Sequence, residues 1–192
     1  MVQNMSCKIY MDHAATTEML PQVRKAMEPY LMEEYGNAST SYEMGRRTRE
    51  ALEGAREQIA MLIKAKPEEI FFTSGGSESD NWVIKNVAAE KKEKGKHVIT
   101  SKIEHHAVLR SCEYLEKLGY ELTYLDVDAY GVIDLAQLRE VLREDTTLVS
   151  VMTGNNEIGT IEPLDAVASM LRGTGTYFTP MRCRPSGRFR FP

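Results

Sequence analysis

The sequence predicts an α/β fold, with a mostly parallel sheet that is covered by helices on both faces. The first observation is an alternation, from residue 9 to about residue 170, of short apolar runs with longer segments of helical periodicity. The second is that most of these runs are continuously apolar, which is typical of strands buried on both faces. The third is the length of 192 residues, which allows one good-sized domain, or a domain and a fragment, and little more.

The first third of the chain predicts two strands and two helices. Residues 9–11 form a short strand-like piece. A helix is expected over 21–34, because Pro21 suits a first helical turn and apolar residues follow at helical spacing. A second, longer helix is expected over 42–64, and after Pro67 the apolar residues 70–73 predict the next strand.

The remainder repeats the alternation with three more strands and four more helices. The strands are expected at 97–100, 121–125 and 147–152. The helices are expected from the turn at 74–79 to about residue 92, and over 104–118, 134–143 and 164–171. Beyond residue 178 neither the strand period nor the helix period continues.

Composition excludes several classes of protein. With 24 Lys+Arg against 28 Asp+Glu, the net charge of −4 argues against a dedicated nucleic-acid binder. No apolar run approaches the roughly 20 residues that span a bilayer, and the start shows no secretory signal. The three cysteines, Cys7, Cys112 and Cys183, match no metal-ligand spacing and fit a reducing cytoplasm. We therefore expect a cytoplasmic protein without a membrane, nucleic-acid or metal partner, in which Cys112 is a small core residue.

Residues 74–77, Ser-Gly-Gly-Ser, lie between an expected strand and an expected helix. Small residues there allow a ligand to approach the backbone, and the free N–H groups of the first helical turn attract anions. A phosphate site is one interpretation. The alternative is a tight turn in which Ser77 caps the helix, and the segment matches neither a Walker loop nor a dinucleotide fingerprint.

Two further polar segments follow strands and reach the same edge of the sheet. Glu104-His105-His106 offers a histidine that transfers protons near neutral pH or lies against an aromatic ring, although a capping or surface role is the alternative and is preferred for His106. Residues 154–159 offer two amides and a carboxylate, but also resemble an ordinary turn. Because ligands of open α/β sheets gather at the carboxyl ends of the strands, the three segments together predict a pocket with a phosphate anchor, a histidine and an asparagine donor.

With these segments in place, the sequence resembles the amino-terminal half of cysteine desulfurases, pyridoxal 5'-phosphate (PLP) enzymes of the class V aminotransferase group. The resemblance runs from Ile9 to about Phe178 and has five markers in the family's order. The markers are residues 10–17, 36–39, 73–81, 104–109 and 155–160. It implies the large domain of a fold-type-I PLP enzyme, mostly parallel and here incomplete.

The resemblance also implies the residues of the cofactor site. Gly76 and Ser77 would hold the phosphate of PLP, although the family usually has Thr where Ser77 stands. His105 would stack on the pyridine ring and assist proton transfer. Asn156 would contact the ring hydroxyl.

For the substrate, L-cysteine, the resemblance assigns a second set of residues. Ala15 and Thr16 would line its pocket, and Asn37 would lie near the mouth. Tyr42 stands where the family commonly has a histidine, and it receives no role.

The activity implied by resemblance converts L-cysteine to L-alanine and transfers the sulfur to an enzyme persulfide for iron–sulfur cluster or thio-cofactor biosynthesis. A sulfur-acceptor or scaffold protein is the implied partner, and the intact parent is expected to be a homodimer. Two alternatives stay open: another class V PLP enzyme, such as a selenocysteine lyase or an aminotransferase, and a non-catalytic fragment that pairs with an intact partner.

The tail, residues 179–192, departs from the family. It has no acidic residue and four arginines, Arg182, Arg184, Arg188 and Arg190. The tail can be encoded by codons that, with one C added in front, read His-Thr-Asp-Ala-Val-Gln, the segment with which the family continues; the first two bases of each codon are set by the tail and the third bases are chosen. We therefore expect a nucleotide lost just after the codon for Phe178, and three regions: a segment 1–20, a partial PLP-binding domain 21–178 and an out-of-frame tail 179–192. The literal product would lack the family's pyridinium Asp, Schiff-base Lys and nucleophilic Cys, and is expected to be inactive.

Overall fold

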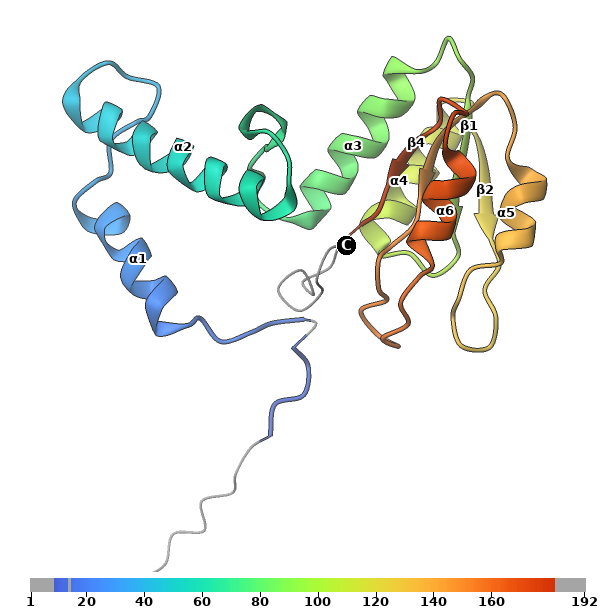
Figure 1. Cartoon of the computed structure of the whole chain (residues 1–192), viewed down its shortest axis with the longest axis horizontal. Helices are drawn as coiled ribbons and strands as arrows, with labels where there is room; N and C mark the ends of the chain where they lie inside the picture. The colour runs from blue at the N-terminus through green and yellow to red at the C-terminus, as the bar shows by residue number, and fades with distance from the viewer. Residues whose placement is uncertain (1–8, 14, 182–192) are drawn as a thin grey trace, which may run out of the picture. The chain divides into compact units, whose positions relative to one another are not determined.

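The computed structural model describes residues 9–13 and 15–181 (Figure 1). These residues form two compact units, one that ends at Phe72 and one that begins at Thr73. The tail beyond Met181 lies outside the described residues, so the expected region boundaries at 20/21 and 178/179 stay predictions.

The first unit is helical. Helix α1 spans Pro21–Met32 with the proline in its first turn, α2 spans Glu43–Ile63, and a short 3₁₀ helix, η1, spans Pro67–Glu69. Helix α2 ends at Lys64, whose backbone is left-handed with φ 56°. The two helices predicted here are confirmed to within two residues at each end.

The strands predicted at 9–11 and 70–73 are wrong. Within the described residues, neither segment pairs with another strand. The carbonyl of Ile70 accepts a hydrogen bond from Arg56 of α2, whose guanidinium lies 5.1 Å from the ring centre of Phe72. The apolar run is therefore held by a helix of its own unit and not by a sheet.

The second unit contains a parallel sheet of four strands in the order β2-β1-β3-β4. The strands are β1 His97–Ser101, β2 Glu121–Leu125, β3 Thr146–Ser150 and β4 Tyr177–Thr179. The helices are α3 Gly76–Glu90, α4 His106–Lys117, α5 Leu135–Val141 and α6 Leu164–Leu171. The predicted α/β class is confirmed, and three strands and four helices stand where they were expected.

Strand β4 was not predicted, and it crosses the expected boundary at residue 178. The pairing with β3 extends beyond Thr179, because the carbonyls of Thr179 and Met181 accept hydrogen bonds from the N–H groups of Val151 and Thr153, at 3.2 and 2.7 Å. Met181 is buried. The first three residues of the tail are thus part of the folded unit.

Both faces of the sheet are covered by helices, which explains the continuously apolar strands. Val98 and Leu148 point toward α3 and α4, while their neighbours Ile99 and Val149 point toward α5 and α6. All four of these side chains are fully buried. The described helices of the chain are too short or too polar to span a bilayer.

Polar side chains hold together the edge of the sheet at which the strands begin, the amino-terminal edge. Lys94 donates from Nζ to the carbonyls of Thr146 and Thr174, at 2.7 and 3.1 Å. The buried imidazole of His97 is hydrogen-bonded through both ring nitrogens, to the hydroxyls of Thr146 and Thr123, each at 2.8 Å. This edge is therefore occupied by structural contacts, and the carboxyl edge is left for a ligand.

Candidate functional site

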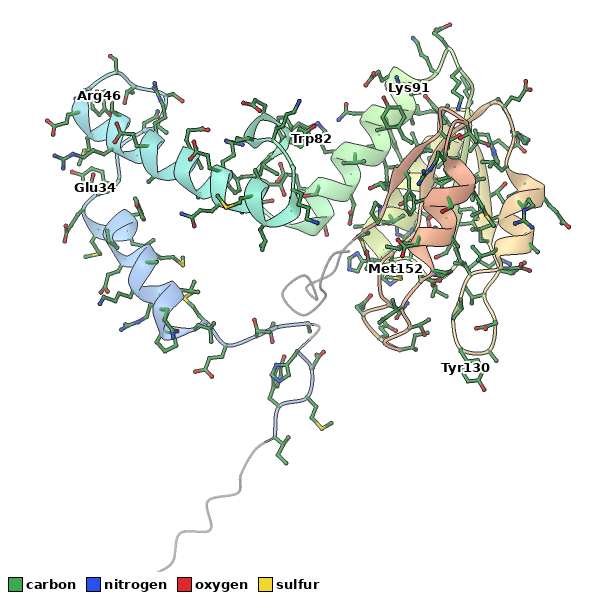
Figure 2. All side chains as sticks on the ribbon, in the orientation of Figure 1. Glu34, Arg46, Trp82, Lys91, Tyr130 and Met152 are labelled. Carbon is green, nitrogen blue, oxygen red and sulfur yellow. The ribbon has the colours of Figure 1, made fainter. Side chains whose placement is uncertain are left out.

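The strand order places a topological switch point between β1 and β3. From β1 the chain passes through α4 to β2 on one side, and β3 then pairs with the other side of β1. The segments that leave the carboxyl ends of β1 and β3 therefore diverge toward opposite faces of the sheet. Such a crevice is where open α/β sheets bind ligands. Figure 2 shows Met152 at this end of the sheet.

The amino terminus of α3 lies at the same edge, because α3 and α4 both run from the carboxyl edge toward the amino edge (Figure 1). Gly75 is the residue that precedes the helix, and no side chain caps it. Ser77 is inside the first turn, so the alternative in which Ser77 caps the helix is wrong. By helix geometry, the N–H groups of Gly76 and Ser77 have no partner within α3.

The space in front of this turn is open. A Cβ added to Gly75 or Gly76 would meet no atom within 4 Å, so packing within the described chain does not require glycine at either position. This open space leaves room for a ligand beside the free N–H groups of the first turn. Together with the helix dipole, this arrangement fits a phosphate group.

In the same turn, the carboxylate of Glu78 is engaged by the backbone and side chain of Ser74. It accepts hydrogen bonds from the N–H and the hydroxyl of Ser74, at 2.6 and 2.7 Å, and these bonds hold the pKa of Glu78 below its ordinary value. The charge of Glu78 thereby stabilises the loop that leads into α3.

His105 is the residue that caps α4. Its Nδ1 accepts a hydrogen bond from the N–H of Ala107 at 3.1 Å, so the neutral imidazole carries its proton on Nε2. The side chain is half-buried, whereas that of His106 is exposed, with 6.3 Å between the ring centres. His105 therefore caps α4, as one interpretation expected, and within the described residues its Nε2–H makes no hydrogen bond.

Asp80 of α3 lies within electrostatic reach of His105. Burial raises the pKa of the Asp80 carboxyl, and the charge of His105 opposes that rise. The helix that offers the anion site and the histidine thus face the same region.

The two adjacent asparagines behave differently. Asn155 uses its whole amide: Oδ1 accepts from the N–H groups of Glu157 and Ile158, at 2.9 and 3.1 Å, and Nδ2 donates to the carbonyl of Ile103 at 3.0 Å. Asn156 is half-buried, and its amide makes no hydrogen bond within the described part of the chain. Asn156 is therefore the one with donors to offer a ligand.

Sequence reasoning gave no role to Glu104, which the structure places at the centre of this edge. Its Oε1 accepts from the N–H of Met152 and from the hydroxyl of Ser101, at 2.7 and 2.9 Å, and its Oε2 is buried without a partner among the described residues. Burial, helped by the charges of Glu162 and Asp80, raises the pKa of Glu104 to about 7. The available signal was a carboxylate directly after a buried strand and directly before a candidate histidine.

The residues expected to line the substrate pocket belong to the first unit. The N–H of Ala15 donates to the carbonyl of Asp12 at 3.2 Å, and the hydroxyl of Thr16 is hydrogen-bonded to that of Tyr10. Asn37 closes a local turn by accepting from the N–H of Ser39 at 2.9 Å. The structure thus gives their local geometry, and their substrate roles stay predictions.

Cys112 lies in the core, as expected. Burial, with the nearby charge of Glu104, raises the pKa of its thiol to about 12, so it is protonated and unreactive at neutral pH. Cys7 and Cys183 lie outside the described residues. Within residues 9–13 and 15–181, no three His, Cys, Asp or Glu side chains are arranged to hold a metal ion.

Comparison with known proteins gives a family match over nearly the whole described chain. Residues 9–179 match the family model "Aminotransferase class-V". Cysteine desulfurase IscS of Dictyoglomus turgidum is 52% identical over 174 residues, which are 91% of this chain and 44% of that protein. Cysteine desulfurase IscS of Methanosarcina thermophila is 48% identical over 170 residues, covering 88% of this chain and 42% of that protein.

Solved structures agree with the sequence matches. A "NifS-like protein" superposes with a TM-score of 0.86 at 35% identity, covering 93% of this chain and 52% of that one. A structure described as SspA in complex with cysteine has a TM-score of 0.84 at 37% identity, covering 88% of this chain and 49% of that one. The chain therefore spans about half the length, or less, of the relatives that it matches.

Proposed function

The chain belongs to the aminotransferase class V family, and on that basis we propose that it is the cofactor-binding part of a cysteine desulfurase that uses PLP. One observation carries the proposal. The open first turn of α3 lies at the same sheet edge as His105 and Asn156, which supports a site where an anion-binding turn, an aromatic ring and an amide donor would share the switch point.

Each group fits one part of PLP. The free N–H groups of Gly76 and Ser77 would bind the phosphate, with the hydroxyl of Ser77 as a further donor. Asn156 would donate from Nδ2 to the ring hydroxyl. PLP, when bound, supplies the electron sink for carbanion chemistry, while the protein supplies orientation and proton transfer.

His105 would serve the ring in two ways. The hydrogen bond from the N–H of Ala107 to Nδ1 fixes the imidazole plane, so that one face is available for stacking. The same bond leaves Nε2 as the atom that holds a transferable proton. The fixed tautomer is therefore suited to an acid–base role.

For the intact parent, we propose conversion of L-cysteine to L-alanine with sulfur transfer to an enzyme persulfide. Ala15, Thr16 and Asn37 would contact the substrate. Iron–sulfur cluster or thio-cofactor biosynthesis would use the sulfur, through an acceptor or scaffold protein, and the parent would be a cytoplasmic homodimer. The name of one structural neighbour, which includes cysteine, supports the choice of substrate.

We also propose that residues 179–192 are read out of frame. Among the described residues, the buried hydroxyls of Ser150 and Thr153 have no hydrogen-bond partner, and both lie on the part of the chain that pairs with residues 179–181. Met181 offers an apolar side chain there, whereas the restored frame offers His, Thr and Asp. Nucleotide sequencing of this junction tests the idea, which an intact frame without the shifted match would refute.

Cofactor binding is tested with pyridoxamine 5'-phosphate, which binds without a Schiff base. In the ¹⁵N-labelled chain we expect NMR shift changes at Gly76, Ser77, His105 and Asn156. A Gly76→Asp variant places a carboxylate beside the N–H groups that would bind the phosphate, and should weaken binding at least about tenfold.

The matched control is Gly54→Asp, at a helical glycine of α2 whose Cβ position is also open. This variant should bind like the unchanged chain. Equal weakening by both variants, or no shift at the four residues, would contradict the site. Sulfide release from cysteine and PLP above a no-protein control would contradict the expected inactivity of the 192-residue product.

A further inference from the structure

Two segments leave the carboxyl edge of the sheet at the switch point, and each carries one candidate ligand-binding side chain. The segment after β1 leads to His105, and the segment after β3 leads to Asn156. A flat ligand between these side chains requires a fixed separation of the two segments. The strands themselves end before either residue, so the sheet hydrogen bonds do not set that separation.

Two side-chain hydrogen bonds connect these segments directly. The Oε1 of Glu104 accepts from the N–H of Met152 at 2.7 Å, and the Nδ2 of Asn155 donates to the carbonyl of Ile103 at 3.0 Å. In both bonds the donor belongs to the Asn156 segment, but the side-chain partner comes from the His105 segment in the first bond and from the Asn156 segment in the second. Glu104 immediately precedes His105, and Asn155 immediately precedes Asn156, so each side chain that makes a connecting bond is next to the residue that it would position.

Glu104 is well suited to hold its bond. Its side chain is only 5% exposed, and the same Oε1 also accepts from the hydroxyl of Ser101 at the end of β1. Water has little access to replace either contact. The carboxyl group therefore fixes the start of α4, which His105 caps, to the end of β3.

Asn155 fixes the other segment through a turn. Its Oδ1 accepts from the N–H groups of Glu157 and Ile158, which closes the chain around Asn156. Its Nδ2 then ties this closed turn to Ile103. No donor or acceptor of Asn155 is left for a ligand, in contrast to Asn156.

We propose that Glu104 and Asn155 are positioning residues that form a two-point clamp, which sets the distance between His105 and Asn156 and hence the gap that receives the aromatic ring. This inference rests on the proposed function for the identity of the ring. The clamp itself is a property of the ligand-free chain.

The variants separate the clamp from other roles of the same residues. Glu104→Met removes the acceptor at nearly constant length, whereas Glu104→Gln keeps an Oε1 acceptor. Asn155→Asp keeps the acceptor for the turn but loses the donor to Ile103. Glu113→Met, on helix α4, which follows Glu104, has a side chain that is 45% exposed and is the matched control.

The first measurement is amide hydrogen exchange in the ligand-free chain. Glu104→Met should accelerate exchange of the Met152 amide at least about tenfold, with Ile99 inside β1 unchanged. Glu104→Gln should restore protection, and Glu113→Met should have no effect. Unchanged exchange at Met152 in Glu104→Met would overturn the clamp whether or not a cofactor binds.

The second measurement is the affinity for pyridoxamine 5'-phosphate, with the NMR shifts of the His105 ring as a local readout. Glu104→Met and Asn155→Asp should each weaken binding about tenfold and reduce the His105 shift, while Gly76 and Ser77 still respond. Glu104→Gln should bind within about threefold of the unchanged chain. Full affinity with an unchanged His105 shift in both clamp variants would overturn the inference.

The two proposals fail in different ways. If the unchanged chain does not bind pyridoxamine 5'-phosphate, the proposed function fails, and the exchange data still decide the clamp. If Glu104→Met does not fold, Asn155→Asp and the Glu104→Gln comparison carry the test.

Discussion

The two units of the chain bury their apolar side chains to very different extents. In the second unit both faces of the sheet are packed, and Leu148 and Val149 at its centre are fully buried. In the first unit α1 has no buried residue, and α2 buries only Gly45 and Ala60. Large apolar residues such as Leu62, 70% exposed, remain at the surface of α2.

This difference follows from how each kind of element is stabilised. Helices satisfy their backbone internally, so α1 and α2 form without a covered apolar face, whereas the sheet requires several strands and helices at once. The second unit therefore has its own core and carries the proposed cofactor groups. We expect the apolar faces of the first unit to be covered by protein outside that unit.

The difference in burial between the two units is tested most directly by making the same substitution, Leu to Ala, in each of them. Leu148→Ala leaves a cavity between α3, α4 and the sheet, and should lower the free energy of unfolding by about 2–5 kcal/mol. Leu62→Ala, at an exposed site of α2, should change it by no more than about 0.5 kcal/mol. Urea unfolding followed by circular dichroism measures both, and similar effects would remove the distinction between the units.

The second test measures how the stability of the folded chain changes with pH because the carboxyl group of Glu104 is buried. The pKa of Glu104 is about 7 in the folded chain and about 4.5 when exposed, so the folded state binds the proton more tightly. Proton binding by Glu104 therefore stabilises the folded state. This contribution to the free energy of unfolding is fully present below pH 4.5 and is lost as the pH rises through 7. Glu104→Gln should match the unchanged chain at low pH and exceed its stability by about 3 kcal/mol at pH 8.

The control for this pH dependence is Glu57→Gln, an exposed position of α2. Because this side chain is exposed and its replacement removes no burial cost, urea unfolding should not show the gain of about 3 kcal/mol at pH 8 that is expected for Glu104→Gln. A difference for Glu104→Gln that does not grow with pH would show that the carboxyl group is solvated in the folded chain.

A smaller effect is expected at the amino-terminal edge of the sheet. Lys94 donates to two carbonyls and, at 3.3 Å, to the hydroxyl of Thr176, and burial lowers its pKa. Lys94→Met should lower the free energy of unfolding by about 1–2 kcal/mol and speed amide exchange in β4. Lys92→Met, at an exposed neighbour, should do neither, and equal effects would show that the three contacts contribute nothing specific.

Much of the fold was determined by local sequence. Helices such as α2 and α4 were predicted because their periodicity and termini are encoded within a few consecutive residues. Strands β1 and β3 were predicted because a doubly covered strand must be apolar throughout. The anion site at Gly76 and Ser77 and the position of His105 before α4 also followed from the order of elements.

Tertiary structure decided which runs became strands and which polar groups became partners. The apolar run at 70–73 has strand composition, but a strand exists only where another strand pairs with it. The hydrogen bonds made by Glu104 and Asn155 depend on partners 48 and 52 residues away in the chain, and the raised pKa of Glu104 depends on burial by the folded unit. The sequence by itself thus determined the elements and the chemical groups at their ends, whereas burial and hydrogen bonding between distant segments, which no local pattern encodes, decided how those groups are held and charged.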